Sequence, residues 1–364
     1  MSTGVASIKS VDVLVVGLGP GGASAARTAA EAGLSVLAVE RNKVLGEPVQ
    51  CAEFIPTPMG GYAKAEKVLL QRITGMKSIL PSGKVHESEF PGLMINRAEF
   101  DRAIAREAER LGAELWTRSP LAALDAEAHI ATVRRENAEV QLRYRMLIAA
   151  DGPHSPVAAQ LGLEPLEVVQ TRQYTVPLLK PYADTDIWLS DEYPGGYAWL
   201  FPKGDLANLG LGADRRWEDN LKEPLERLHR QLVEAGLLGE EILYRTGGAI
   251  PVGGLRAQLV VGEVLFVGDA AGLTHPITGA GIAAAVVSGE LAGKAAAAYL
   301  EGDQDAFADY EEDVRDQFET AVNRAVARRQ ELAQHWRTRA ANEDAIQRKG
   351  WIAFNEYFES AAVQ

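Results

Sequence analysis

The stretch VDVLVVGLGPGGASAARTAAEAGLSVLAVER, residues 11–41, is the most informative part of this chain. Its pattern predicts a buried strand, a glycine turn, a helix of small residues and a second strand that ends in an acid. Gly17, Gly19 and Gly22 form the pattern GxGxxG, which permits a tight turn, a close approach of pyrophosphate and close helix packing. Glu40 closes the second strand and is placed to accept a hydrogen bond from a ribose hydroxyl. The stretch therefore predicts dinucleotide binding.

A second motif is needed to choose the dinucleotide, because such a fingerprint suits both FAD and NAD enzymes. Residues 265–281, LFVGDAAGLTHPITGAG, predict a short strand followed by a helix of small residues over about 279–300. Asp269 at the strand end is placed to bind a ribityl hydroxyl, and the positive end of the helix suits the pyrimidine edge of a flavin. A plain strand and buried helix would not explain this combination, so the sequence favours FAD. The other candidate residues here are Pro276, Gly279 and Gly281.

A third motif lies between these two. Residues 146–155, MLIAADGPHS, predict an apolar strand that runs into Asp151 and Gly152. A strand that ends in Asp-Gly is a common turn by itself. Its place in this order makes Asp151 a further candidate for cofactor binding.

Together, GLGPGG with Glu40-Arg41, ADGPHS and GDAAGLTHPITGAGI resemble the flavoprotein group of aromatic hydroxylases, lycopene cyclases, flavin halogenases and geranylgeranyl reductases. Two further segments are similar to the geranylgeranyl reductase family: GEPVQCAEFI (46–55) and GGYAWLFPKGDLANLGLG (195–212). INRAEFD, which contains Arg97, matches a third segment of that family. The resemblance covers roughly the first 300 residues, and the chain is rather short for the family.

The resemblance implies an enzyme that reduces carbon–carbon double bonds of an isoprenoid chain, with hydride from reduced flavin N5 and a proton from an acid. It implies that Arg41 and Arg97 join the cofactor site and that Cys51 is a flavin neighbour or proton donor. A lone cysteine is more often a small buried hydrophobe. His275, beside Pro276, is a second catalytic candidate, although a core histidine would explain it equally well.

An aromatic strand is the candidate substrate surface. Tyr197, Trp199 and Phe201 alternate, so their side chains project from one face of a strand. Such a face is often plain core. In a domain that covers a flavin it suits an elongated apolar ligand, and the family resemblance favours substrate contact. Glu47, Glu53 and Arg41 are unranked candidates for holding a polar head group.

The flavin motifs lie in separated blocks, so we expect a mixed α/β chain with one discontinuous Rossmann-type domain. The expected FAD-binding domain comprises residues 1–60, 95–165 and 258–303. The expected antiparallel β-sheet substrate domain comprises residues 61–94 and 166–257. Residues 304–364 are expected to form a helical C-terminal segment, which is either a solvated appendage with one packed face or a membrane-surface foot that collects lipid. Its interleaved aromatic residues are Trp336, Trp351, Phe354, Tyr357 and Phe358.

Composition bounds the class of protein. The 364 residues are 47% hydrophobic, enough for a large core, and the net charge of −13 argues against a nucleic-acid partner. The single cysteine excludes an internal disulfide, and the six histidines show no spacing typical of a metal site. No apolar run reaches the ~18 residues that a spanning helix needs. We expect a cytoplasmic protein, with peripheral contact at a membrane surface as an option.

Only one Rossmann fingerprint is present, so we expect electrons from a transiently bound NADPH or another reductant. Two alternatives remain open at the level of sequence: an FAD-dependent monooxygenase (hydroxylase) on an apolar or aromatic substrate, and a non-redox flavoprotein with a structural flavin. Halogenases usually carry a lysine in the segment occupied here by residues 46–52, which contains none. Cys51 and the Tyr-x-Trp-x-Phe-Pro strand favour reduction.

Overall fold

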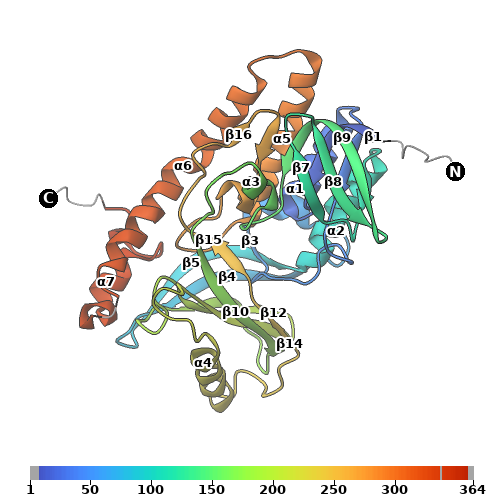
Figure 1. Cartoon of the computed structure of the whole chain (residues 1–364). Coiled ribbons are helices and arrows are strands. Elements are labelled where there is room, and N and C mark those ends of the chain that lie inside the picture. Colours follow the sequence, from blue (N-terminus) through green and yellow to red (C-terminus); the bar gives the residue numbers. More distant parts are fainter. Residues whose placement is uncertain (1–7, 337, 360–364) are drawn as a thin grey trace.

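The structure is a computed structural model, and it describes residues 8–336 and 338–359. Its described strands form two sheets, with helices packed around them (Figure 1). The mixed α/β class expected from the sequence is confirmed. The longer helices are α1 (Pro20–Glu31), α2 (Arg97–Arg110), α4 (Lys222–Glu234), α5 (Ile282–Glu301) and α6 (Ala306–Ala333). The shorter ones are α3 (Pro156–Gln160), α7 (Asp344–Lys349) and the 3-10 helices η1 (Thr57–Ala63), η2 (Gly268–Ala271), η3 (Arg339–Asn342) and η4 (Asn355–Tyr357).

The first sheet contains the buried strands of the sequence motifs. Its central strands run parallel in the order β17, β9, β1, β2, β6, and a β7–β8 hairpin continues from β9. The carboxyl ends of the parallel strands therefore meet along one edge, where ligands bind in open α/β sheets. The strands are β1 (Lys9–Val16), β2 (Val36–Val39), β6 (Glu114–Trp116), β7 (Leu121–Asp125), β8 (Ile130–Arg135), β9 (Ala138–Ala149), β16 (Val260–Val261) and β17 (Val264–Phe266).

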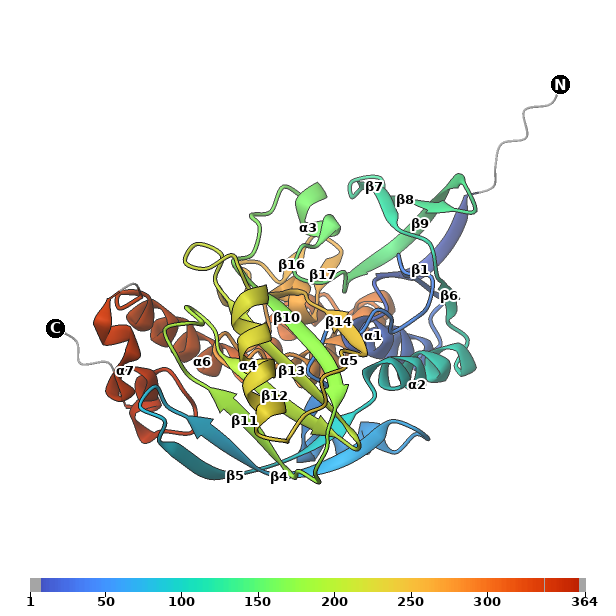
Figure 2. The same cartoon turned by 90° about the horizontal axis from the view of Figure 1, so that it is seen from below.

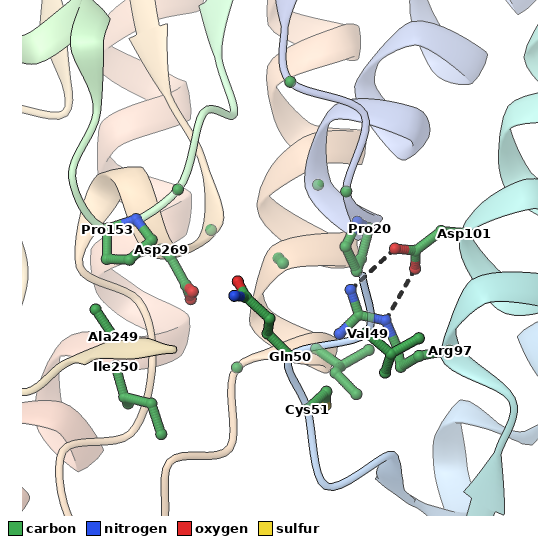
Figure 3. Close-up of a pocket in the computed structure, with 18 of the residues that line it drawn as sticks. Pro20, Val49, Gln50, Cys51, Arg97, Asp101, Pro153, Ala249, Ile250 and Asp269 are labelled. Atoms are coloured by element: carbon green, nitrogen blue, oxygen red, sulfur yellow. Dashed lines mark hydrogen bonds and ion pairs between the residues drawn. The ribbon is translucent and has the colours of Figure 1, made fainter. Parts of the chain in front are cut away.

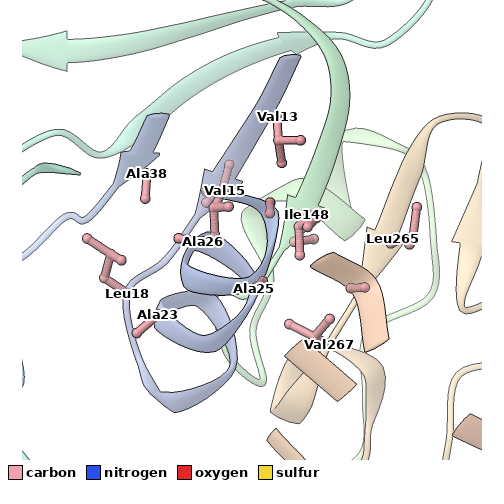
Figure 4. Close-up of a cluster of buried hydrophobic side chains, with 14 of the residues drawn as sticks. Val13, Val15, Leu18, Ala23, Ala25, Ala26, Ala38, Ile148, Leu265 and Val267 are labelled. Carbon is pink, nitrogen blue, oxygen red and sulfur yellow. The ribbon is translucent and has the colours of Figure 1, made fainter. Parts of the chain in front are cut away.

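Small residues allow α1 to lie close to the sheet and to α5. Ala25 and Ala26 are fully buried against side chains such as Val15 and Ile148 (Figure 4). On the other side, a Cβ atom added to Gly289 of α5 would lie 2.1 Å from the carbonyl oxygen of Gly21. Larger residues would push the helices apart, so the small-residue pattern of both helices sets their spacing.

The second sheet is mainly antiparallel, as expected, although β11 pairs with β4 in parallel. Helix α4 covers one face, where Leu225 and Leu228 pack on Tyr174 and Leu209 (Figure 2). The strands are β3 (Phe54–Pro56), β4 (Leu69–Ile79), β5 (Val85–Ile95), β10 (Val168–Pro177), β11 (Asp184–Trp188), β12 (Ala198–Lys203), β13 (Leu206–Ala213), β14 (Tyr244–Thr246) and β15 (Ala249–Pro251).

The C-terminal segment packs on both sheets: Tyr310 and Val314 at the start of α6 join the core of the first sheet, and residues 351–354 lie on the second. Trp351 and Phe354 belong to a buried cluster with Ile187 and Trp199. The buried Arg328 of α6 donates to the backbone carbonyls of residues 356, 357 and 359 and so ties the chain end to the helix. Of the five aromatic residues singled out in the sequence, four are buried and only Phe358 is exposed, at 54%. The described part of the segment therefore packs its aromatic residues against the rest of the chain.

Candidate functional site

A cavity of about 430 Å³ lies between the carboxyl edge of the first sheet and the second sheet. Its size is typical of small-molecule sites. Chain segments far apart in sequence meet there, as the close-up in Figure 3 shows. Most of the candidate residues line this cavity: Gly17, Gly19, Glu40, Arg41, Cys51, Arg97, Asp151, Tyr197, Trp199, Phe201, Asp269, Gly279 and Gly281. The candidates that do not line it are Gly22, His275 and Pro276.

The glycine turn after β1 has the geometry of a phosphate cradle. Gly17 has φ +98°, and a Cβ atom there would lie 2.3 Å from the carbonyl oxygen of Ala150. A Cβ atom on Gly22 would lie 1.9 Å from the carbonyl oxygen of Gly17, so Gly22 serves the close helix packing. A Cβ atom on Gly19 would meet nothing within 4 Å. The open face at Gly19 and the side-chain-free cap of α1 fit a pyrophosphate.

Glu40 is held rigidly where β2 ends. Its Oε2 accepts from the backbone N–H of Leu18 at 3.0 Å, and its Oε1 accepts from that of Asn42 at 2.8 Å. Each carboxylate oxygen can accept a further hydrogen bond. The carboxylate therefore fits a ribose hydroxyl.

Asp151 carries an unsatisfied acceptor in the cavity. Its Oδ2 accepts from the backbone N–H of Val157 at 2.9 Å, whereas its Oδ1 is buried and has no hydrogen-bond partner among the described residues. Burial raises the pKa of this carboxyl. A buried orphan acceptor normally has a partner, so this atom fits a hydroxyl group of a bound cofactor.

The start of α5 forms the opposite wall. Asp269 Oδ1 accepts from Thr274 Oγ1 at 2.5 Å, and burial raises the pKa of this carboxyl. Gly281 lies so close that a Cβ atom would sit 2.4 Å from Thr274 Oγ1. No side chain caps α5 at Gly281, so its first N–H groups remain available for a flavin edge.

His275 faces the C-terminal segment instead. Its Nδ1 accepts from the backbone N–H of Thr278 at 3.2 Å, which leaves the proton on Nε2, 3.2 Å from Tyr357 Oη. Burial lowers the pKa of His275 to about 4, so the ring is neutral at neutral pH. With both ring nitrogens engaged and no contact with the cavity, His275 orders the loop before α5.

Arg97 supplies a fixed positive charge beside the cavity. Its guanidinium binds Asp101 through two bonds, with Nε–Oδ1 of 3.0 Å and Nη2–Oδ2 of 2.9 Å (Figure 3). Burial opposes the charge, but Asp101 and Cys51 outweigh it and raise the pKa of Arg97. The guanidinium therefore stays charged next to the cysteine.

Cys51 lies on the same side of the cavity as Arg97, across from Asp269 (Figure 3). Its Sγ accepts from the backbone N–H of Glu53 at 3.2 Å, and its carbonyl oxygen accepts from Gln173 Nε2 at 3.0 Å. Burial raises the pKa of the thiol more than Arg97 lowers it. The thiol is therefore protonated at neutral pH, which is the form that a proton donor needs.

Three aromatic side chains form a wall of the cavity. Tyr197 donates to the carbonyl oxygen of Thr278, and its ring lies 4.9 Å from that of Trp351. Trp199 Nε1 donates to Gln173 Oε1 at 3.1 Å, and its indole occupies space over Gly210, where a Cβ atom would lie 2.4 Å away. The Phe201 ring completes the wall.

Asp101, Gln173 and Asn208 also hold the site, and the sequence motifs do not single them out. The spacing of Asp101 indicates its pairing, because a position four residues after Arg97 lies on the same helix face. Gln173 and Asn208 are strand residues without any local pattern, and they hold the backbone at Cys51 and Ala52.

Comparisons with known proteins identify the cofactor and the family of the chain. Residues 12–84 and 64–295 match two family models, each described as FAD dependent oxidoreductase. The chain is an FAD-dependent oxidoreductase, and its cofactor is FAD. It is 34% identical over 352 residues to a digeranylgeranylglycerophospholipid reductase of Thermoplasma volcanium, across 90% of this chain and 89% of that protein. The chain belongs to the geranylgeranyl reductase family, as the motifs predicted.

Solved structures give the same result for the fold. A geranylgeranyl bacteriochlorophyll reductase-like protein of Thermoplasma acidophilum has a TM-score of 0.83 and 30% identity, covering 90% of this chain and 88% of that one. A probable FAD-dependent monooxygenase of Pseudomonas aeruginosa has a TM-score of 0.70 at 20% identity, covering 92% and 98%, and shares the fold alone. Across residues 8–336 and 338–359, no helix is long and apolar enough to cross a membrane.

Proposed function

We propose that this enzyme reduces carbon–carbon double bonds in the isoprenoid chains of a lipid. The observation that carries the proposal is the cavity in which a protonated thiol, Cys51, and an aromatic wall adjoin the FAD-binding residues. The relatives, whose names specify reduction of digeranylgeranylglycerophospholipid, support an isoprenoid substrate. The monooxygenase alternative has only the shared fold in its favour.

The chain's residues divide the work of this reduction. Reduced FAD, held by these residues, would supply the hydride for one alkene carbon, which is a two-electron reduction. We propose that Cys51 gives its proton to the other carbon, so that the alkene gains two hydrogens, and that the thiolate is then reprotonated from solvent. The neutral form of the thiol at neutral pH supports this role. Arg97 lies close enough to stabilise the thiolate after transfer.

The proposed cofactor residues follow from the fit of the cavity to FAD. Gly17, Gly19 and Gly22 would form the pyrophosphate turn, and Glu40 would bind the ribose. Asp151 and Asp269 would accept from hydroxyl groups of FAD. Gly279, Gly281 and the N-terminus of α5 would meet the flavin, with Arg41 at the cavity wall, while His275 and Pro276 would shape the loop.

We propose that the aromatic wall of Tyr197, Trp199 and Phe201 lies along the isoprenoid chain. The wall is packed among apolar side chains, including Trp351 of the C-terminal segment.

We propose that the cofactor domain is built around the first sheet and the substrate domain around the second. β3 belongs to the second sheet. The first block of the cofactor domain, expected to end at residue 60, is therefore proposed to end before residue 54, where β3 begins.

The reductant and the membrane contact complete the proposal. Only one Rossmann fingerprint is present, and Gly210 and Gly212 lie in β13, where Gly210 makes room for Trp199. This supports a transient reductant such as NADPH.

A lipid substrate would reach the enzyme at a membrane surface. The aromatic residues of the C-terminal segment are mostly buried, so we propose peripheral membrane contact through another face of the molecule. Flotation of the intact chain with anionic vesicles tests this membrane contact. A soluble fraction that is the same with and without vesicles contradicts it.

The test of the reaction is a product analysis. The FAD-loaded enzyme, a chemical reductant and a digeranylgeranyl glycerophospholipid are incubated, and the lipid is examined by mass spectrometry. We expect the lipid to gain a pair of hydrogen atoms for each double bond reduced. A product that gains oxygen in air, or an unchanged lipid, contradicts the proposal.

A further inference from the structure

Glu53 is a buried carboxylate in the site that the proposed reaction leaves without a role. Its residue is 3% exposed, although it lines the cavity two positions after Cys51. Its Oε2 is ion-paired with Lys203 Nζ and accepts from Asn208 Nδ2 at 2.8 Å. Its Oε1 accepts from the backbone N–H of Arg97 at 3.0 Å. One side chain thus connects the second sheet with the start of α2.

The backbone of Glu53 is equally engaged. Its φ of +71° lies in the left-handed region, which non-glycine residues rarely adopt. This conformation lets its N–H donate to Cys51 Sγ at 3.2 Å, while its carbonyl oxygen accepts from the N–H of Ile95 at 2.9 Å. Asn208 Nδ2 also donates to the carbonyl oxygen of Ala52 at 3.2 Å. Residues 51–53 are therefore held as one rigid turn.

A buried ion pair is weak evidence for a stabilising role, because apolar residues of similar volume often stabilise as well or better. The Glu53 carboxylate, paired with Lys203, lies close enough to Cys51 for its charge to act on the thiolate. The strained backbone and the bond to Sγ both serve the geometry of the same thiol. This convergence indicates a function at Cys51.

We propose that Glu53, paired with Lys203, is a positioning residue for the reduction, because its backbone N–H fixes Cys51 Sγ in the cavity and its carboxylate is anchored beside the thiol. The inference rests on the proposed function of Cys51 as proton donor. Other charged or titratable groups around the thiol are Arg97 with Asp101 from α2, Tyr197 before β12, and Asp269 across the cavity. Burial is the main cause of the raised pKa of Cys51; Arg97 and the backbone N–H of Glu53 lower this pKa, and the Glu53 carboxylate raises it.

The test uses the thiol itself. Cys51 is the only cysteine, so the rate of alkylation by iodoacetamide, followed by intact mass in the FAD-loaded enzyme, reports this group alone. Only the thiolate reacts, so the pH midpoint of the rate measures its ionisation. We expect Glu53→Gln to move the midpoint to lower pH and to speed alkylation at neutral pH by about threefold or more. We expect Lys203→Met to move it to higher pH.

Two variants are matched controls. Glu53→Asp keeps the charge on a shorter side chain and should move the midpoint less than Glu53→Gln does. Glu290→Gln removes a partly buried carboxylate bound by Arg27 and Tyr62, outside the cavity lining, and should leave the midpoint unchanged. A packing role for Glu53 would raise the rate of Glu53→Gln at every pH without moving its midpoint. That result, or shifts of the same sign in Glu53→Gln and Lys203→Met, overturns the proposal.

Turnover separates this proposal from the proposed function. If the wild type reduces the isoprenoid lipid, Glu53→Gln should lower the maximal rate of flavin reoxidation by about tenfold with little change in KM. An unchanged maximal rate in Glu53→Gln, with Cys51→Ala inactive, overturns the positioning role alone. If the wild type reduces no alkene, the proposed function fails, and the alkylation midpoints still decide whether Glu53 controls the thiol.

Discussion

Arg97 and Asp101 face each other across one turn of α2 and join through two parallel hydrogen bonds, of 3.0 and 2.9 Å, beside the cavity. The side chain of Asp101 is 4% exposed and that of Arg97 is 18% exposed. The pair orients the guanidinium toward Cys51, since both bonds fix the plane of the group. Loss of Asp101 would leave a buried positive charge without its partner.

We expect Asp101→Asn to reduce the free energy of unfolding by about 3 kcal/mol, because breaking a buried pair leaves one charge uncompensated. Urea denaturation at neutral pH measures this change. Glu107→Gln, on the exposed side of the same helix and paired with Arg110, is the matched control and should change nothing measurable. Equal effects of the two substitutions would show that the Arg97–Asp101 pair is of no special importance.

The glycines of the fingerprint should separate into binding and folding roles. Gly19→Ala adds a Cβ atom that meets no protein atom within 4 Å, at a φ of −72° that any residue adopts, so stability should be kept while FAD retention falls. Gly22→Ala places its Cβ atom 1.9 Å from a carbonyl oxygen and should cost about 1–3 kcal/mol of stability or more. Thermal unfolding of the apo forms and flavin content after gel filtration measure both. Loss of stability in Gly19→Ala would refute this division.

Because His275 is buried in its neutral form, the free energy of unfolding should fall in acid. Its pKa is lowered to about 4 in the folded state, compared with about 6.5 in an unfolded chain. The unfolded state therefore binds more protons between these values, so stability is present above pH ~6.5 and is lost as the pH falls towards 4. The full difference is about 3 kcal/mol.

We expect His275→Asn to lose less stability than the wild type between pH ~6.5 and ~4, measured by urea denaturation in matched buffers. His154→Asn removes an exposed histidine and serves as the control, with the wild-type pH dependence. Parallel curves for all three proteins would contradict the burial of a neutral His275.

Arg328 should be decisive for the C-terminal segment. Its guanidinium donates to backbone carbonyls of that segment and binds Glu331. We expect Arg328→Met to cost about 3 kcal/mol, because one buried and two partly buried carbonyl acceptors lose their donor, and to expose Trp351 to a fluorescence quencher. Gln317→Met, an exposed position on the same helix, should have no such effect. Unchanged quenching in Arg328→Met would mean that the segment is held by other contacts.

The sequence predicts the parts of this site that are local in the chain. Gly17, Gly19 and Glu40 belong to one βαβ unit, and their spacing alone defines a turn and a strand end. The ion pair between Glu53 and Lys203 joins residues 150 positions apart. It depends on which strands pair, and no local pattern carries that information. The contact between His275 and Tyr357 also joins distant parts of the chain, so no local pattern indicates it.

The C-terminal segment shows a second limit. The spacing of Trp351, Phe354 and Tyr357 predicts a helical tail with one packed face, but hydrophobicity does not specify a partner. In the structure the partner is the second sheet beside Trp199, and a membrane is not needed to cover these side chains. No local pattern indicates the parallel pairing of β11 with β4 either, because it joins two segments separated by helices α2 and α3 and several strands.

An anaerobic single turnover most directly tests whether the enzyme reduces an isoprenoid lipid with Cys51 as proton donor. The FAD-loaded wild type and Cys51→Ala are reduced with dithionite, mixed with a digeranylgeranyl glycerophospholipid, and followed by the flavin absorbance band. We expect the lipid to reoxidise the flavin of the wild type, with saturation of the lipid's double bonds. We expect Cys51→Ala to bind FAD equally well but to be reoxidised far more slowly. Reoxidation of the wild type only after oxygen is admitted would contradict it.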